Sequence, residues 1–198
     1  MKIRLEEEKD YFMNENLTRE AFWNVYRPGC YEHYILHKIR TDKCYVKELS
    51  YVMEDKQRLV GSIVYAKGKV RNENGINEVL LFGPVSILPE YQGAGYGKKL
   101  IKFTLKKAKE LGYPAVVITG KPEYYEKLGF KSASKYNIFY KGMENEENLF
   151  FMVKVLDRHK MKSIYGIYSD PEVYMVDQKD VEQFDKKFPK KKKEKREG

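Results

Sequence analysis

The sequence predicts a mixed α/β (α+β) protein from three observations. Three strand-like segments at residues 49–53, 59–65 and 79–88 are separated by short polar turns, a spacing typical of antiparallel hairpins. Residues 95–111 place apolar side chains at helical spacing among lysines, which predicts an amphipathic helix. Residues 115–119 form a short apolar run rich in β-branched residues, which predicts a buried strand. Strand, glycine-rich loop, helix and strand therefore follow one another as in a βαβ unit.

The remaining elements follow from local signals along the chain. Residues 1–5 alternate apolar and basic side chains, which predicts a short strand. Thr18 is expected to cap a helix over residues 18–27 that ends at Pro28 and Gly29, and a second helix is expected over residues 31–40. Pro122 suits the first turn of a short helix that ends at Gly129. Two further strands are expected at residues 138–140 and 149–156.

The chain of 198 residues, of which 42% are hydrophobic, is expected to form one main domain. We expect this domain to span residues 1–157. Residues 158–185 keep enough apolar side chains to pack on it as a C-terminal extension. Residues 186–198 carry a net charge of +6 out of +9 for the whole chain, so we expect a basic, disordered tail.

Composition and charge exclude several classes of protein. Without the tail the chain is close to neutral, which does not favour nucleic acid as a partner. No apolar run reaches 18 residues and no secretory signal opens the chain, so neither membrane insertion nor export is expected. Cys30 and Cys44 are too few and too far apart for a disulfide scaffold or a CxxC pair, which is typical of a cytoplasmic protein with reduced thiols.

The most informative segment is the glycine-rich turn before the amphipathic helix. Three alternating glycines let the backbone approach a ligand, and the helix that follows offers free amide groups and a partial positive charge. The segment lacks the GxGxxG spacing of a dinucleotide fold, and Lys99 stands where a Walker A loop has Ser or Thr. What remains is a Gln-x-x-Gly-x-Gly pattern formed by Gln92, Gly95 and Gly97.

This pattern resembles the pyrophosphate loop of the GNAT superfamily of acyl-CoA-dependent N-acyltransferases. The run from Tyr124 to Phe130 strengthens the resemblance, which covers roughly residues 79–130. The chain also resembles a subgroup of predicted bacterial acetyltransferases that carry an extra C-terminal segment. The resemblance implies a mostly antiparallel central sheet flanked by helices, with acetyl-CoA as the acyl donor.

The resemblance also assigns cofactor-binding residues. The backbone of the loop is expected to grip the pyrophosphate of acetyl-CoA through Gln92, Gly93, Ala94, Gly95, Tyr96, Gly97 and Lys98. The end of the preceding strand is expected to pair its main chain with the pantetheine arm through Val85, Ser86 and Ile87. The side chains of Val85 and Ile87 are equally typical of an ordinary core.

By the same resemblance Tyr125 is the general acid that returns a proton to the thiolate of CoA, and Tyr124 packs the short helix. A phenol is protonated at neutral pH and can donate. The implied activity is transfer of an acetyl group to a primary amine, most simply that of a small molecule, although a protein amine is also compatible. The alternative is a catalytically silent sensor that binds acyl-CoA.

No residue stands out as a general base. Leu81 occupies the position where some family members place a glutamate, and Glu78 is expected on the opposite face of the strand. Deprotonation of the amine through water is therefore expected. His33 and His37 lie one helical turn apart, but no third ligand accompanies them, so we expect a partly exposed helix face and no metal site.

The acceptor side is less defined than the donor side. Thr119 or backbone replaces the asparagine that many family members use to hold pantetheine. Trp23, Tyr26, Arg27 and Tyr31 cluster after the first helix and form either an acceptor pocket or ordinary core. The sequence is compatible with a monomer or a homodimer.

Overall fold

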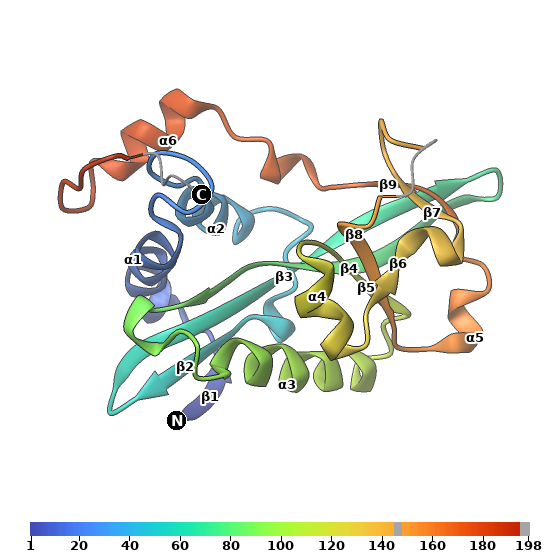
Figure 1. Cartoon of the computed structure of the whole chain (residues 1–198), viewed down its shortest axis with the longest axis horizontal. Helices are drawn as coiled ribbons and strands as arrows, with labels where there is room; N and C mark the ends of the chain where they lie inside the picture. The colour runs from blue at the N-terminus through green and yellow to red at the C-terminus, as the bar shows by residue number, and fades with distance from the viewer. Residues whose placement is uncertain (145–147, 195–198) are drawn as a thin grey trace. The chain divides into compact units, whose positions relative to one another are not determined.

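The computed structural model describes residues 1–144 and 148–194 (Figure 1). Contacts within the chain divide it into two compact units. The first unit comprises Met1–Val64, Gly83–Ile101 and the C-terminal stretch from Glu172, and the second comprises Tyr65–Phe82 and Lys102–Pro171. Three long elements contribute residues to both units: strand β3 (Arg58–Asn72), strand β4 (Gly75–Ile87) and helix α3 (Tyr96–Glu110). The expected division after residue 157 therefore differs from the division that the contacts make.

Nine strands of the described residues form one mixed sheet that is mostly antiparallel. The pairs β4–β5 and β7–β9 are parallel, whereas β1–β2, β2–β3, β3–β9, β5–β8 and β6–β8 are antiparallel. The strands other than β3 and β4 are β1 (Lys2–Leu5), β2 (Tyr51–Asp55), β5 (Ala115–Thr119), β6 (Lys131–Ser132), β7 (Ile138–Tyr140), β8 (Phe151–Val155) and β9 (Gly166–Ser169). The predicted fold class is confirmed.

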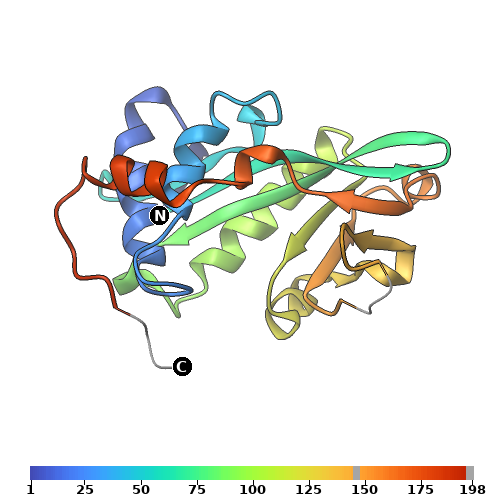
Figure 2. The same cartoon turned by 90° about the horizontal axis from the view of Figure 1, so that it is seen from above.

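The first unit packs three helices together beside the antiparallel strands β1, β2 and β3. These helices are α1 (Tyr11–Phe22), α2 (Glu32–Ile39) and α6 (Gln178–Asp185), and they lie side by side in both views (Figure 2). Leu17, Leu36 and Ile39 are buried among them. The pairing of β2 with β3 sets Val52 opposite Ser62, and both residues are fully buried.

The second unit contains β5, which is buried over Ala115–Val117. It pairs with β4 on one side, at Leu81 and Val117, and with β8 on the other. Two short helices, α4 (Pro122–Tyr125) and α5 (Arg158–Met161), belong to this unit. Strand β9 pairs with both β3 and β7, so the segment after residue 157 adds a strand to the second unit before it supplies α6 to the first.

The first predicted helix is wrong in position. The structure places α1 at Tyr11–Phe22, after a capping box between Glu7 and Asp10, and Thr18 lies inside the helix. The buried face of α1 is largely polar, since Asn14, Glu15, Thr18 and Arg19 are all buried along with Leu17. A polar inner face gives little hydrophobic periodicity, so the pattern did not mark this helix.

Residues 186–194 differ from the expected disordered tail. Phe188 is 5% exposed and stacks on Phe12, and Lys191 forms an ion pair with Glu20 at 2.6 Å. The guanidinium of Arg19 donates to the carbonyl of Pro189 at 3.1 Å. These contacts hold the segment against α1, and the rest of the expected tail, residues 195–198, lies outside the described residues. Within the described ranges, no helix has the length and apolar character needed to cross a bilayer.

Candidate functional site

The glycine-rich turn connects the end of β4 to the start of α3, as predicted. A single 3-10 turn at Pro89–Tyr91 precedes it, and the side-chain amide of Gln92 donates to the carbonyl of Ile87 at 2.9 Å, which closes the turn on the strand. The amide of Lys99 donates to the carbonyl of Gly95 at 3.0 Å, the first bond of the helix. The amides of the first turn of such a helix point out of its N-terminus, toward the loop.

Two glycines in this loop have conformations that other residues rarely adopt. Gly93 has φ +77° and Gly95 has φ +83°, and a Cβ atom built at either position would meet nothing within 4 Å. The two residues and Ala94 between them are exposed. The loop therefore presents open backbone, the surface that a pyrophosphate group requires.

Side chains at the end of β4 point alternately to the two faces of the strand, within the first unit. Ser86 is fully buried, and its hydroxyl shares a hydrogen bond of 2.9 Å with the hydroxyl of Thr18 on α1. Ile87 points to the other face, where a Cβ built on Gly61 would lie only 2.7 Å from its Cδ1 atom. Val85 and Ile87 are half-buried. The side chains of Ser86 and Ile87 therefore have packing roles.

Tyr125 lies at the end of α4 in the second unit, in an aromatic cluster. Its ring centroid is 6.1 Å from Phe82, 5.6 Å from Phe130 and 5.0 Å from Tyr124. Gly120 makes room for this ring, because a Cβ there would come within 2.3 Å of its Cε2 atom. Gly129, with φ +80°, ends the helical segment as predicted. Burial raises the pKa of the neighbouring Tyr124.

Comparison with known proteins bears directly on this arrangement. Residues 46–132 match a family model for the acetyltransferase (GNAT) domain. Residues 46–132 are therefore a GNAT acetyltransferase domain. The matched region contains the predicted glycine loop together with Tyr125, so the resemblance inferred from these motifs is confirmed.

Individual relatives of this GNAT protein are distant. The N-acetyltransferase YjhQ of Escherichia coli K12 is 28% identical over 83 residues, which are 42% of this chain and 46% of YjhQ. The N-acetyltransferase YhbS of the same organism is 25% identical over 104 residues, 52% of this chain and 60% of YhbS. The chain thus spans only about half the length of these curated relatives.

Solved structures show the same fold over most of the chain. YhbS from Escherichia coli in complex with CoA superposes with a TM-score of 0.75 at 22% identity, covering 88% of this chain and 92% of that one. A GNAT family acetyltransferase from Brucella melitensis in complex with acetyl-CoA gives a TM-score of 0.71 at 24% identity, covering 87% and 97%. The GNAT fold therefore extends beyond the 46–132 match.

The two positions considered for a general base hold a core leucine and an exposed, ion-paired glutamate. Leu81 is 7% exposed and pairs with Val117, so it is part of the core. Glu78 is exposed, and its carboxylate forms an ion pair with Lys67 at 3.1 Å. The expectation that neither residue is a base is compatible with this geometry.

The interpretation of the two histidines as one partly exposed face is wrong for His33. The side chain of His37 is 46% exposed and contacts Glu15 at 2.9 Å, whereas His33 is fully buried. Burial lowers the pKa of His33 to about 4, against the opposing effect of the nearby Asp185 carboxylate, so the imidazole is neutral at neutral pH. Within residues 1–144 and 148–194 no group of three metal-ligating side chains comes together.

The structure adds a buried polar cluster that the sequence did not indicate. Nδ1 of His33 lies 3.2 Å from the sulfur of Cys30, and Nε2 lies 3.1 Å from a carboxylate oxygen of Asp185. Arg19, with its side chain 1% exposed, donates to Asp185 at 2.6 Å. Burial raises the pKa of Cys30 to about 12, so this thiol is not a nucleophile. The cluster joins α1, α2 and α6, and no signal in the sequence pairs residues so far apart.

Three of the four residues proposed for an acceptor pocket line a cavity. Trp23 is buried with the guanidinium of Arg19 over its ring at 4.1 Å, and Arg27 lies over Tyr31 at 4.1 Å. Tyr26 is 71% exposed and is not among the residues that line the cavity. The opposite wall comes from α6, an element that the sequence analysis had not connected with this region.

Proposed function

We propose that this GNAT protein transfers the acetyl group of acetyl-CoA directly to a primary amine, most simply that of a small molecule. The observation that carries the proposal is the loop that begins at Gln92 and leads into α3. Its exposed glycines, Gly93 and Gly95, leave the backbone accessible at the N-terminus of that helix. An open backbone at a helix N-terminus suits the pyrophosphate of acetyl-CoA. The acetyl-CoA and CoA complexes of the two structural relatives support the same donor.

The reaction then needs few groups from the protein. The neutral amine attacks the thioester carbonyl and forms the new C–N bond, the C–S bond breaks, and the thiolate of CoA leaves. Tyr125 would give its phenolic proton to that thiolate, which prevents the reverse attack. The amine would lose its extra proton to water, because neither Leu81 nor Glu78 is suited to accept it.

The first test measures the binding of acetyl-CoA in the absence of any amine acceptor. Isothermal titration with acetyl-CoA is expected to give saturable heat, whereas NAD, which has a pyrophosphate but no pantetheine arm, is expected to give none. Dephospho-CoA, which differs from CoA only by the missing 3′-phosphate, is expected to bind more weakly than CoA. A screen of amines for release of free thiol would then identify the acceptor. Absence of binding to acetyl-CoA at any concentration would contradict the proposal.

The loop itself is tested by Gly95→Ala. Alanine is strained at φ +83°, so the loop is expected to relax and the affinity for acetyl-CoA to fall by about tenfold, which corresponds to ~1.4 kcal/mol. Gly75→Ala is the matched control, because Gly75 also has positive φ and open space around it but lies in the β3–β4 turn. Equal affinities for both variants and the wild type would show that the loop does not hold the donor.

The alternative function, a silent acyl-CoA sensor, is favoured by one observation: the leucine in place of a glutamate base. The two functions separate on turnover, since a sensor would bind acetyl-CoA and release no thiol with any amine in the screen.

A further inference from the structure

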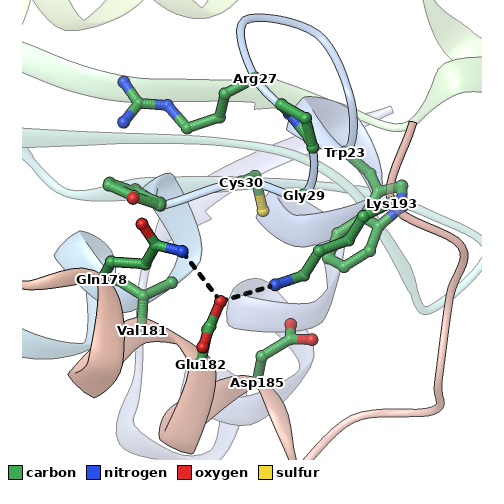
Figure 3. Close-up of a pocket in the computed structure, with 11 residues that line it drawn as sticks. Trp23, Arg27, Gly29, Cys30, Gln178, Val181, Glu182, Asp185 and Lys193 are labelled. Carbon is green, nitrogen blue, oxygen red and sulfur yellow. Dashed lines mark hydrogen bonds and ion pairs between the residues drawn. The ribbon is translucent and has the colours of Figure 1, made fainter. Parts of the chain in front are cut away.

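The first unit contains a cavity of about 330 Å³ between the α1–α2 loop and α6 (Figure 3). Its volume lies within the range of small-molecule sites. Trp23, Gly29 and Cys30 form one wall, and Val181, Glu182 and Asp185 on α6 form the other. Asp185 is already engaged by Arg19, so Glu182 is the carboxylate at this cavity that is open to exchange.

A primary ammonium group already lies in the wall of this cavity, against Glu182. Nζ of Lys193 lies 3.3 Å from the Oε1 atom of Glu182, and the side-chain amide of Gln178 donates to the same oxygen at 3.1 Å (Figure 3). The alkyl stem of Lys193 runs over Gly29, where a Cβ would be 3.3 Å from its Cε atom. A glycine with φ +76° at this position thus leaves a channel for an unbranched alkyl chain.

The backbone on either side of Lys193 is held in the manner of a bound peptide. The carbonyl of Lys192 accepts from the indole of Trp23 at 2.9 Å and from the side-chain amide of Asn24 at 3.1 Å. The amide of Glu194 donates to the side-chain oxygen of Asn24 at 3.2 Å. The side chains that fix this main chain all belong to the α1–α2 loop, which recognises it independently of the neighbouring side chains.

The ion pair between Lys193 and Glu182 can be replaced by one between Glu182 and another ammonium group. The side chains of Lys193 and Glu182 are 44% and 47% exposed. Ion pairs with that exposure contribute little to stability, so a competing ammonium group in solution can displace Lys193 without unfolding α6.

We propose that this cavity is a binding site for a primary alkylammonium group, from a small amine or from a lysine side chain, with Glu182 as its counterion and Lys193 as an internal competitor. The site goes beyond the acetyl transfer proposed above and does not depend on it, because binding requires neither acetyl-CoA nor turnover. Removing Lys193 would free the site for an external amine.

The chain offers a specific probe, because Trp23 is its single tryptophan and lines the cavity. The full-length Lys193→Ala variant is titrated with n-butylamine while the fluorescence of Trp23 is followed. The expected half-saturation concentration is at least tenfold lower for Lys193→Ala than for the wild type. Lys192→Ala is the matched control, since that side chain is 84% exposed and pairs with Glu194 instead. It is expected to behave as the wild type.

Two further experiments test which chemical groups take part in binding at this cavity. Adding Glu182→Gln to Lys193→Ala is expected to weaken n-butylamine binding at least tenfold, and n-butanol, which lacks the charge, is expected not to bind. A peptide with the sequence of residues 189–194 distinguishes the sources: tighter binding than n-butylamine indicates a lysine side chain on a protein, and weaker binding indicates a small amine. The proposal is overturned if both probes bind Lys193→Ala no better than the wild type, or if Glu182→Gln has no effect.

Discussion

Tyr125 illustrates how much of a residue's suitability for chemistry depends on its neighbours. The packing of its ring against Phe82 and Phe130, with Gly120 leaving space beside it, fixes the ring on the second unit. A phenylalanine at the same position would keep this packing and lose only the hydroxyl. The side chain can therefore be tested for proton donation without disturbing the fold.

We expect Tyr125→Phe to lower the rate of acetyl transfer by about 10²–10⁴-fold, the usual contribution of a general acid. The affinity for acetyl-CoA, measured by titration calorimetry, should be unchanged because the ring remains. Tyr124→Phe is the matched control and should keep turnover near that of the wild type. Wild-type turnover in Tyr125→Phe would remove this residue from the mechanism and leave the donor site intact.

His33 makes a second prediction, on pH dependence. In the unfolded chain its pKa is near 6.5, whereas burial lowers the pKa to about 4 in the folded protein. The unfolded state therefore takes up a proton first as the pH falls, so the free energy of unfolding should decrease by about 3 kcal/mol between pH 6.5 and 4 through this residue. Above pH 6.5 the histidine is neutral in both states and has no such effect.

Urea unfolding at several pH values checks this slope. His33→Gln should flatten the decrease between pH 6.5 and 4, whatever its effect on stability at pH 7. His159→Gln, at an exposed position, should leave the slope as it is. An identical slope in wild type and His33→Gln would mean that folding does not lower the pKa of His33.

The helices α1 and α2 are held together by charge as much as by apolar packing. Arg40, at the end of α2, forms ion pairs of 2.6 Å with Glu6 and with Glu15. All three side chains are buried, at 3%, 1% and 7% exposure. The guanidinium also lies 4.1 Å from the ring centre of Tyr11. One cation thus satisfies two buried carboxylates.

Arg40→Ala should therefore destabilise the protein by about 3–5 kcal/mol, because Glu6 and Glu15 lose the guanidinium that they share while both carboxylates stay buried. Equilibrium unfolding in urea measures this loss. Lys9→Ala removes one partner of the exposed pair with Glu7 and is expected to leave the unfolding midpoint unchanged. A small effect of Arg40→Ala would mean that water reaches these carboxylates in solution.

Strands β3 and β4 and helix α3 each contribute residues to both compact units of the chain. A ligand that binds only the folded chain stabilises it by mass action. At a concentration of acetyl-CoA 100 times its Kd, the stabilisation should be ~2.7 kcal/mol.

For a protein of this length that stabilisation corresponds to a rise in Tm of roughly 5–10 °C. Differential scanning calorimetry with and without acetyl-CoA measures it, and NAD at the same concentration should leave the Tm unchanged. An unchanged Tm at saturating acetyl-CoA would contradict binding to the folded chain.

The sequence alone determined the elements whose signals are local. The strand at Ala115–Thr119, the strand at Ile138–Tyr140 and the helix after the glycine loop all follow from periodicity, β-branched runs and glycine placement. The GNAT domain was indicated separately, by the resemblance of the Gln-x-x-Gly-x-Gly segment to the family. Backbone propensity and side-chain alternation act over a few residues, so a sequence shows them directly.

Tertiary structure decided the polar interior and the course of the C-terminal segment. Arg19 and Asp185 are 166 residues apart, and the α1–α2 loop holds the backbone next to Lys193, which pairs with Glu182. Burial of a charged side chain is favourable only when a distant partner supplies the opposite charge, and no local pattern encodes that partner. For the same reason the position of α1, with its polar inner face, and the full burial of His33 became evident only in the folded chain.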